Sequence, residues 1–314
     1  MSFEDLTFIK LIGRGISGDV FLTLKKNENM YYATKIIKSS YFKNPKGYKY
    51  LCDEINILKD LNHPNILKYI EHRKTKEKMY IITEYYNGGT LRDFLYNYQQ
   101  IYNNKNLSEE IVQYIMRQIV EGMKYIHNKK IIHRDICPDN IMLHYEDEND
   151  RINKNIMKAK IKIIDFGFAK YLKKGELTTS SILCTSFYMD PIILFRLNKI
   201  LEYKDYGYDK KVDIWSLGII FYELLTGNIP FEAARMTELV EKVKKGDYYV
   251  PGTISNEAFS FLTSMLEYDP KKRESIDILY NHEFLRKNVN EFTNLNKYYD
   301  KREIKINIKG FNNI

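Results

Sequence analysis

Apolar and polar residues alternate along the first quarter of the chain. The alternation runs over residues 6–24 and again over 31–37, and a period of two residues predicts antiparallel strands with one buried face. Further strands are expected at 67–72 and 79–84. Residues 48–61 instead show the periodicity of an amphipathic helix. This part of the chain is therefore expected to form a small antiparallel sheet with one helix.

Helical patterns dominate the rest of the chain. The pattern at 211–227 is apolar all round, which is typical of a helix at the centre of a lobe. Its Asp213 would be buried and must therefore be paired. The long pattern at 107–127 begins beside Ser108, a residue type that caps helices. The polar run at 144–155 is expected to be a surface loop. Other helices are predicted at 238–245, 256–266 and 275–279.

These patterns predict an α+β fold of two lobes. A small antiparallel β lobe with one helix would span residues 1–85, and a larger, mostly helical lobe would span 86–287. Gly88 and Gly89 follow a strand and precede an amphipathic segment, as expected of a hinge between lobes. Residues 288–314 form a polar tail in which we recognise no motif.

Composition limits the class of protein. With 314 residues, 44% of them hydrophobic, the chain can bury a sizeable core. The net charge is +8, but Lys and Arg alternate with Asp and Glu, which favours a solvated basic surface over a nucleic-acid site. No apolar run approaches the ~20 residues that span a bilayer, and the start lacks the order of a signal peptide. We therefore expect a cytoplasmic or nuclear protein without a transmembrane segment. The cysteines, Cys52, Cys137 and Cys184, lack metal-ligand spacing and fit a reducing compartment.

A charged loop, I-I-H-R-D-I-C-P-D-N-I-M-L, lies at residues 131–143 between two short apolar runs. The runs are typical of buried strand ends, and loops on a rigid scaffold often hold catalytic groups. Asp135 is followed five residues later by Asn140, a spacing that suits a base and a metal ligand. Simple turn chemistry is the other interpretation of an Asp and an Asn in a tight loop. Further parts of a phosphoryl-transfer site in the right order would decide between the two.

A glycine-rich turn, G-R-G-I-S-G-D-V, lies within the first alternating stretch. Gly13, Gly15 and Gly18 have no Cβ atom, so their backbone can approach a phosphate closely. Val20 continues into a strand, whereas a dinucleotide-binding turn would lead into a helix. The turn therefore favours a nucleotide loop between two strands.

Three charged residues follow in the order that such a site requires. Lys35 stands among apolar neighbours in Y-A-T-K-I-I, where its ammonium needs an anionic partner. Glu54 is expected on the inward face of the helix at 48–61, which makes it the candidate partner. Later, an apolar strand leads to Asp165 in D-F-G, a candidate Mg²⁺ ligand.

Taken in order, these motifs resemble the catalytic domain of eukaryotic serine/threonine protein kinases over roughly residues 6–287. The resemblance implies ATP and Mg²⁺ as cofactors, a protein substrate with a Ser or Thr hydroxyl, and regulatory protein partners. Asp135 would accept the hydroxyl proton, and Asn140 and Asp165 would hold Mg²⁺. Lys35, fixed by Glu54, would position the α- and β-phosphates.

The resemblance also implies a nucleotide pocket. Glu84 and Tyr85 would offer backbone groups to adenine, and Thr83 would guard the space behind it. Thr185 matches a residue that touches the catalytic Asp in these kinases. The nucleotide-binding residues expected from the resemblance are Gly13, Gly15, Gly18, Val20, Ala33, Lys35, Thr83, Glu84 and Tyr85.

Two subfamilies share features with the chain. The segments I-K-I-I-D-F-G-F-A-K-Y-L and E-Y-Y-N-G-G-T-L are most similar to autophagy-initiating kinases. The hinge residue Thr83 and the sequence K-K-G-D-Y-Y instead resemble the catalytic half of calcium-dependent kinases. No EF-hand loop of the form D-x-[DN]-x-[DN]-G occurs in the sequence.

The chain departs from the kinase pattern near the site. Cys137 replaces a lysine that serine/threonine kinases place beside the γ-phosphate, and Cys184 replaces a glycine. We therefore expect a slow kinase, while an ATP-binding pseudokinase scaffold and a regulatory docking module stay open. Arg134 could pair with a phosphate on Thr178, Thr179, Ser180 or Ser181, so we expect activity to depend on phosphorylation there.

A third departure lies in D-P-I, which replaces A-P-E. Ile192 stands where a glutamate would pair with Arg273. A buried guanidinium without a carboxylate is costly. Either solvent reaches Arg273, or Asp190 or Glu267 replaces the missing partner.

Overall fold

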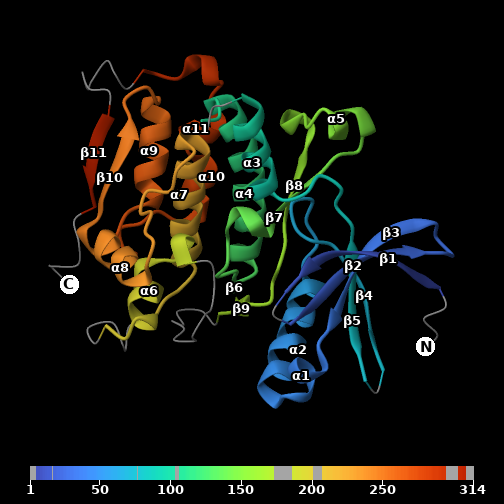
Figure 1. Cartoon of the computed structure of the whole chain (residues 1–314). Helices are drawn as coiled ribbons and strands as arrows, with labels where there is room; N and C mark the ends of the chain where they lie inside the picture. Colours follow the sequence, from blue (N-terminus) through green and yellow to red (C-terminus); the bar gives the residue numbers. More distant parts are fainter. Residues whose placement is uncertain are drawn as a thin grey trace.

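The chain folds into two lobes in the structure, a computed structural model (Figure 1). The residues described are 5–15, 17–75, 77–102, 106–172, 186–200, 207–294 and 303–308, with Phe42 and Ser186 described by their backbone only. The smaller lobe is mainly an antiparallel sheet and the larger is mainly helical. The predicted α+β, two-lobe fold is confirmed.

The smaller lobe contains a five-stranded antiparallel sheet in the order β1-β2-β3-β5-β4. Its strands are β1 (Leu6–Arg14), β2 (Gly18–Lys25), β3 (Met30–Ile37), β4 (Tyr69–Lys74) and β5 (Met79–Glu84). The short α1 (Ser39–Lys43) leads into α2 (Pro45–Asp60), so the lobe has one helix more than expected. Asn44 caps α2 by accepting from the N–H groups of Lys46 and Gly47.

The larger lobe consists mainly of helices (Figure 1). They are α3 (Leu91–Tyr102), α4 (Glu109–Asn128), α6 (Pro191–Leu197), α7 (Lys211–Thr226), α8 (Met236–Lys245), α9 (Asn256–Met265), α10 (Ile276–Asn281) and α11 (Glu283–Arg286). Ser108 caps α4 as predicted, its hydroxyl accepting from Ile111 N. Short 3₁₀ turns complete the lobe: η1 (Pro138–Asn140), η2 (Ile156–Lys158), η3 (Ser186–Tyr188) and η5 (Val289–Glu291).

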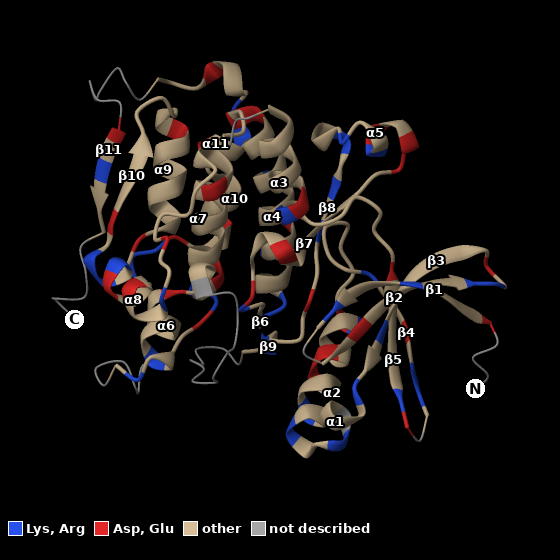
Figure 2. Ribbon diagram, viewed as in Figure 1, with Lys and Arg blue, Asp and Glu red and all other residues tan. Residues whose placement is uncertain are grey.

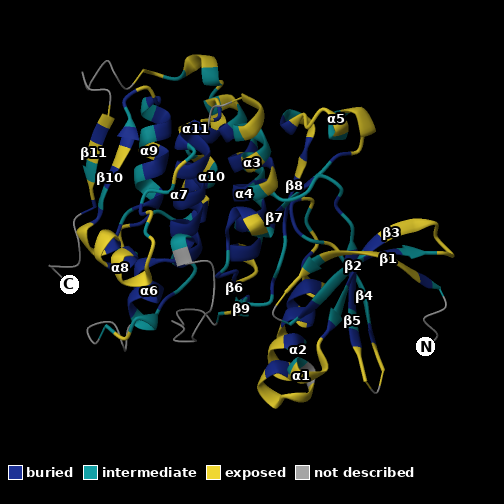
Figure 3. Cartoon of the chain, viewed as in Figure 1, coloured by how far each residue is buried: buried dark blue, intermediate teal, exposed yellow. Residues whose placement is uncertain are grey.

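Helix α7 forms the centre of the larger lobe, as its all-round apolar sequence predicts. Every residue from Val212 to Thr226 is buried (Figure 3). It packs against α4 and α9, and a Cβ on Gly218 would come within 2.7 Å of Leu266. The close approach of these helices therefore depends on this glycine.

Two short strand pairs flank the loops that contain Asp135 and Asp165. β6 (Ile131–Ile132) pairs with β9 (Lys170–Tyr171), and β7 (Ile141–His144) pairs with β8 (Lys160–Ile163). Gly88, in the link between the lobes, packs against β7 so closely that a Cβ would lie 2.7 Å from Leu143. The glycine at this position therefore allows close packing, and the predicted role of Gly88 and Gly89 as a hinge stays a prediction.

Two of the elements that the sequence did not predict lie in polar segments. The polar run at 144–155 contains a short helix, α5 (Glu148–Ile152), capped by Asp147. In the polar tail, β11 (Glu303–Asn307) pairs with β10 (Asp247–Pro251) and buries Ile304. Part of the tail therefore belongs to the folded larger lobe.

Charged residues of both signs occur on both lobes (Figure 2), in keeping with their alternation in the sequence. Among the described residues, none of the helices is long and apolar enough to cross a membrane.

Candidate active site

The loop at 131–143 is held in place by Asp213, which lies at the start of α7. The Asp213 carboxylate accepts from the backbone N–H groups of His133 (3.0 Å) and Arg134 (2.8 Å). It also lies 2.8 Å from Nε2 of His127, near the end of α4. Burial raises the pKa of Asp213, but these bonds outweigh burial and hold the pKa below its usual value. The buried charge predicted at Asp213 is therefore paired, and it fixes the backbone of the loop.

Asp135 and Asn140 meet within this loop. Asn140 Nδ2 donates to the backbone oxygen of Asp135 at 2.8 Å and to its carboxylate Oδ2 at 2.9 Å. The turn η1 brings the two residues together, and Asn140 N donates to Cys137 O across it. The amide of Asn140 therefore orients the carboxylate of Asp135.

Asp165 stands at the end of β8, beside Asn140. Ile141 pairs with Ile163, and Ile164 N donates to Asn140 O at 2.9 Å. Asp165 has a positive φ of 60°, which costs a non-glycine residue about 1–3 kcal/mol. Its Oδ1 accepts from Gly167 N at 3.1 Å. A carboxylate and an amide oxygen are ligands that Mg²⁺ prefers, so Asp165 and Asn140 fit this ion chemically.

Lys35 on β3 pairs with Glu54 on α2. The Lys35 Nζ to Glu54 Oε1 distance is 2.9 Å, and Glu54 is 6% exposed. Burial lowers the pKa of Lys35, but Glu54 and then Asp165 outweigh burial and raise the pKa above its usual value. The lysine is therefore charged, and Lys35, Glu54 and Asp165 share one electrostatic environment.

The glycine-rich turn joins β1 to β2, the strand that pairs with β3, which carries Lys35. Gly15 N donates to Gly18 O at 2.8 Å. A Cβ on Gly18 would lie 2.2 Å from Ile36 O on β3, so only glycine fits there. Val20 pairs directly with Lys35. The turn is thus fixed next to the lysine by its glycines.

The other residues predicted to line the nucleotide pocket come from β3, β5 and the segment that follows β5. Ala33 and Thr83 face each other across β3 and β5, and Thr83 Oγ1 donates to Ala33 O at 3.4 Å. Glu84 N donates to Lys68 O at 3.0 Å, so this N–H is already used within the protein. Tyr85, the next residue along, is partly exposed. The side chain of Glu84 lines a small polar pocket of about 200 Å³ with Lys68 and four other residues.

The remaining site residues singled out in the sequence either lie outside the described part of the chain or are buried. Thr185, Cys184 and residues 178–181 lie outside the described part of the chain. Cys137 is 1% exposed and belongs to the hydrophobic core. Arg134 is buried and donates to Phe168 O and to the Tyr208 hydroxyl.

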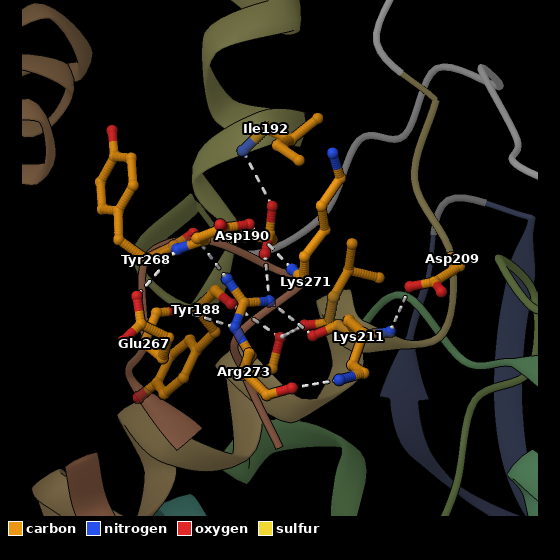
Figure 4. A network of polar contacts seen from close by, with 12 residues as sticks. Tyr188, Asp190, Ile192, Asp209, Lys211, Glu267, Tyr268, Lys271 and Arg273 are labelled. Carbon is orange, nitrogen blue, oxygen red and sulfur yellow. Dashed lines mark hydrogen bonds and ion pairs between the residues drawn. The ribbon is translucent and has the colours of Figure 1, made fainter. Parts of the chain in front are cut away.

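Asp190 replaces the carboxylate that Ile192 cannot provide. Arg273 Nη1 lies 2.6 Å from Asp190 Oδ2, and both side chains are fully buried (Figure 4). Arg273 also donates to the backbone oxygens of Glu267 and Lys211, at 2.8 and 2.6 Å. Of the alternatives that the sequence left open, the structure selects Asp190 as the ion-pair partner and uses Glu267 only through its backbone.

The matched family agrees with this geometry. Residues 6–285 match the family model described as protein kinase domain. The chain belongs to the protein kinase family. In this family, a paired lysine and glutamate, a glycine-rich turn, and Asp and Asn groups near the transferred phosphate form the expected phosphoryl-transfer site.

Curated relatives of the kinase match most of this chain. Calcium-dependent protein kinase 5 of Plasmodium berghei is 34% identical over 93% of it, and calcium-dependent protein kinase 4 of the same species is 31% identical over 90%. The probable serine/threonine-protein kinase MARK-A of Dictyostelium discoideum is 33% identical over 88%. The chain spans only 48%, 50% and 24% of these three proteins, respectively. The closer likeness to autophagy-initiating kinases stays a prediction.

One supporting residue of the kinase escaped the sequence reading. His127 has a fully buried side chain, and its ring bonds to Asp213 beneath the loop. The only hint in the sequence is that this histidine ends a predicted helix, close to the charged loop. No local pattern indicates that it pairs with Asp213, 86 residues later.

Proposed function

We propose that this kinase transfers the γ-phosphoryl group of ATP to Ser or Thr hydroxyls of a protein. The observation that carries the proposal is the pairing of Lys35 with Glu54 at 2.9 Å, in the electrostatic range of Asp165. A structural ion pair would not need a second carboxylate and a glycine-rich turn beside it. The combination fits a site for phosphates and a divalent cation.

The residues of the loop have distinct roles in the proposed reaction. Asp135, oriented by Asn140, would accept the proton of the substrate hydroxyl. The hydroxyl oxygen of the substrate would at the same time form a bond to the γ-phosphorus. The bond from that phosphorus to the bridging oxygen breaks, and ADP leaves. Lys35 would hold the α- and β-phosphates, because Glu54 keeps its ammonium charged and in place.

Asn140 and Asp165 would hold Mg²⁺. When bound, the ion neutralises charge on the phosphates and orients them for in-line transfer. Within the protein, the backbone bond from Ile164 to Asn140 keeps these two ligands together.

The test uses Asp165→Asn and Glu54→Gln, with Asp53→Asn as a matched control. Asp53 precedes Glu54 on the same helix, but its side chain is exposed whereas that of Glu54 is buried. We expect the two site variants to lose at least about 100-fold in transfer rate to a generic Ser/Thr substrate. ATP alone should still raise the melting temperature of Asp165→Asn, while Mg²⁺ should add nothing. Unchanged turnover in Asp165→Asn would refute its role as a metal ligand.

The same measurements separate the alternatives. A pseudokinase would be stabilised by ATP but transfer nothing, and a docking module would show neither response.

We propose that turnover is slow because Cys137 replaces the usual lysine. We also propose a cytoplasmic or nuclear location. An autophagy-initiating role is proposed only on the likeness of the D-F-G and hinge segments.

A further inference from the structure

Arg92 on α3 connects three other parts of the larger lobe. Its Nε lies 3.4 Å from Asp139 Oδ2 in η1, and its Nη1 and Nη2 bond to Glu223 on α7 and to the Tyr188 hydroxyl in η3. Tyr188 in turn donates to Glu223 Oε2 at 2.5 Å. One arginine therefore contacts two carboxylates that lie on separate elements.

The members of this cluster differ in exposure. Glu223 and Tyr188 are 7% and 3% exposed, whereas the Asp139 side chain is 55% exposed. Burial raises the pKa of Tyr188, so its hydroxyl stays protonated and can donate. Burial lowers the pKa of Arg92, but Tyr188 and Glu223 outweigh it, and the guanidinium stays charged. The cluster is thus an acidic pair, Asp139 and Glu223, bridged by a charged arginine; the position between the two carboxylates is called the recess below.

The recess lies beside the catalytic carboxylate. Asp139 immediately precedes Asn140, whose amide bonds to Asp135. Helix α3 packs directly on η1. A peptide whose hydroxyl reaches Asp135 advances by roughly 3.3 Å per residue when extended. Its residues a few positions from the phosphorylated one therefore come within reach of Asp139 and Arg92.

We propose that Arg92 determines substrate specificity by occupying this recess, so that the kinase gains nothing from arginine near the phosphorylated residue of its substrate. The proposal rests on the proposed kinase activity. A guanidinium is the group that would pair best with two carboxylates, through charge-assisted hydrogen bonds. The protein has already placed its own guanidinium there. A substrate arginine must displace Arg92, whose guanidinium then loses its carboxylate partners. This loss cancels the binding energy that the substrate arginine would gain.

The test compares peptides on one enzyme at a time. Ser peptides carry Arg or Ala at each of the four positions on either side of the serine, and kcat/KM is measured for each. For the natural enzyme, every Arg/Ala ratio should lie within about threefold of 1. In Arg92→Ala, the ratio at one or two positions should rise about 10-fold or more, as expected of a hydrogen bond to a charged group. A ratio taken within one enzyme is insensitive to a general loss of activity.

Three further variants define the cause. Arg92→Lys keeps a cation in the recess, so its ratios should stay near 1. Arg92→Ala combined with Glu223→Gln removes the buried acid, so the gain should shrink toward 1. Arg151→Ala removes an exposed arginine of α5 that pairs with Glu148 and not with the recess, and its ratios should match those of the natural enzyme.

Several outcomes would overturn the proposal. One is a natural enzyme that prefers an arginine peptide by more than 10-fold, a result that needs no variant to fold. Another is an Arg92→Ala enzyme with unchanged ratios. If the natural enzyme transfers phosphate to no peptide, the proposed function fails on its own. Fluorescence anisotropy with labelled Arg and Ala peptides then tests the recess by binding, and equal affinities for Arg92→Ala would reject it.

Discussion

The carboxylate of Asp190 forms a fully buried ion pair with Arg273 at 2.6 Å. The other oxygen of Asp190 accepts from Ile192 N at 2.8 Å and so caps α6. Arg273 belongs to the connection between α9 and α10, and its guanidinium lies 5.2 Å from the centre of the Trp215 ring on α7. Asp190 therefore ties the start of α6 to the centre of the larger lobe (Figure 4).

We predict that Asp190→Asn lowers the free energy of unfolding by about 3–5 kcal/mol, because it leaves the guanidinium of Arg273 buried without a counter-charge. The amide oxygen of Asn can still cap α6, so the loss would report the ion pair alone. Denaturant unfolding measures it. A loss below about 1 kcal/mol would show that the backbone oxygens around Arg273 suffice.

The reverse substitution, Ile192→Glu, tests the same relationship from the other side. In the natural protein, Arg273 is already paired and Ile192 is 4% exposed. A second buried carboxylate would be costly, so we expect a lower melting temperature. In the Asp190→Asn background, the new carboxylate should regain part of the lost stability. Stabilisation by Ile192→Glu alone would mean that Asp190 does not satisfy Arg273.

The sequence located the site because its motifs are short and ordered along the chain. The spacing from Asp135 to Asn140 is fixed within one turn, and the inward face of α2 follows from its periodicity, so Glu54 could be directed toward Lys35. For Arg273, the sequence left open whether solvent reaches the guanidinium or whether Asp190 or Glu267 pairs with it. Asp190 and Arg273 lie 83 residues apart, and no local pattern reports such a contact.

The elements that escaped prediction depend on partners distant in sequence. β11 is a short polar segment with alternating isoleucines, and its pairing with β10 closes a gap of more than 50 residues. Nothing in the sequence singles out Arg92, because an arginine on the exposed face of an amphipathic helix is ordinary. Its meaning appears only when α3, η1 and α7 are placed together.

Replacing Thr178, Thr179, Ser180 and Ser181 together by Ala should lower activity. The expected reason is that Arg134, next to Asp135, can pair with a phosphate on this run. The guanidinium already bonds to Phe168 O and the Tyr208 hydroxyl, so it is held near the loop. Transfer assays after phosphatase treatment, with mass-spectrometric mapping, measure the dependence. A variant as active as the natural enzyme would show that activity does not require these residues.

Protonation of the His282 ring should make the protein less stable in mild acid. Its Nδ1 accepts from Phe284 N at 3.1 Å and caps α11, which requires that nitrogen to be unprotonated. Burial lowers the pKa of His282 below 6.5. Below pH 6.5 the unfolded chain therefore binds more protons, and stability declines as the pH falls through the lower, folded-state pKa.

The measurement is the melting temperature between pH 7.5 and 5. His282→Asn keeps a capping oxygen that does not titrate, so its decline with acid should be smaller by about 2 °C. His282→Ala, the control, should be less stable at every pH. An equal decline in the natural protein and His282→Asn would remove this histidine from the pH response.

Cys137→Lys should raise the rate of phosphoryl transfer. A lysine ammonium beside the transferring group stabilises the charge of the transition state, and one such electrostatic donor is typically worth ~10²-fold in rate. Cys137 lies one residue before η1 and is 1% exposed, so the lysine stem would cross the buried position while its ammonium reaches the site. Overpacking should lower stability by about 1–3 kcal/mol.

Single-turnover rates at saturating ATP separate charge from packing when Cys137→Met serves as the control. Methionine fills a similar volume without a charge, so it should share the loss of stability and none of the gain in rate. ATP affinity should change little in either variant, because the lysine acts on the transition state. Equal rates in the Lys and natural enzymes, with a similar fall in melting temperature for Lys and Met, would mean that Cys137 is an apolar filler. Lys35 and Mg²⁺ would then hold the phosphate without a contribution from position 137.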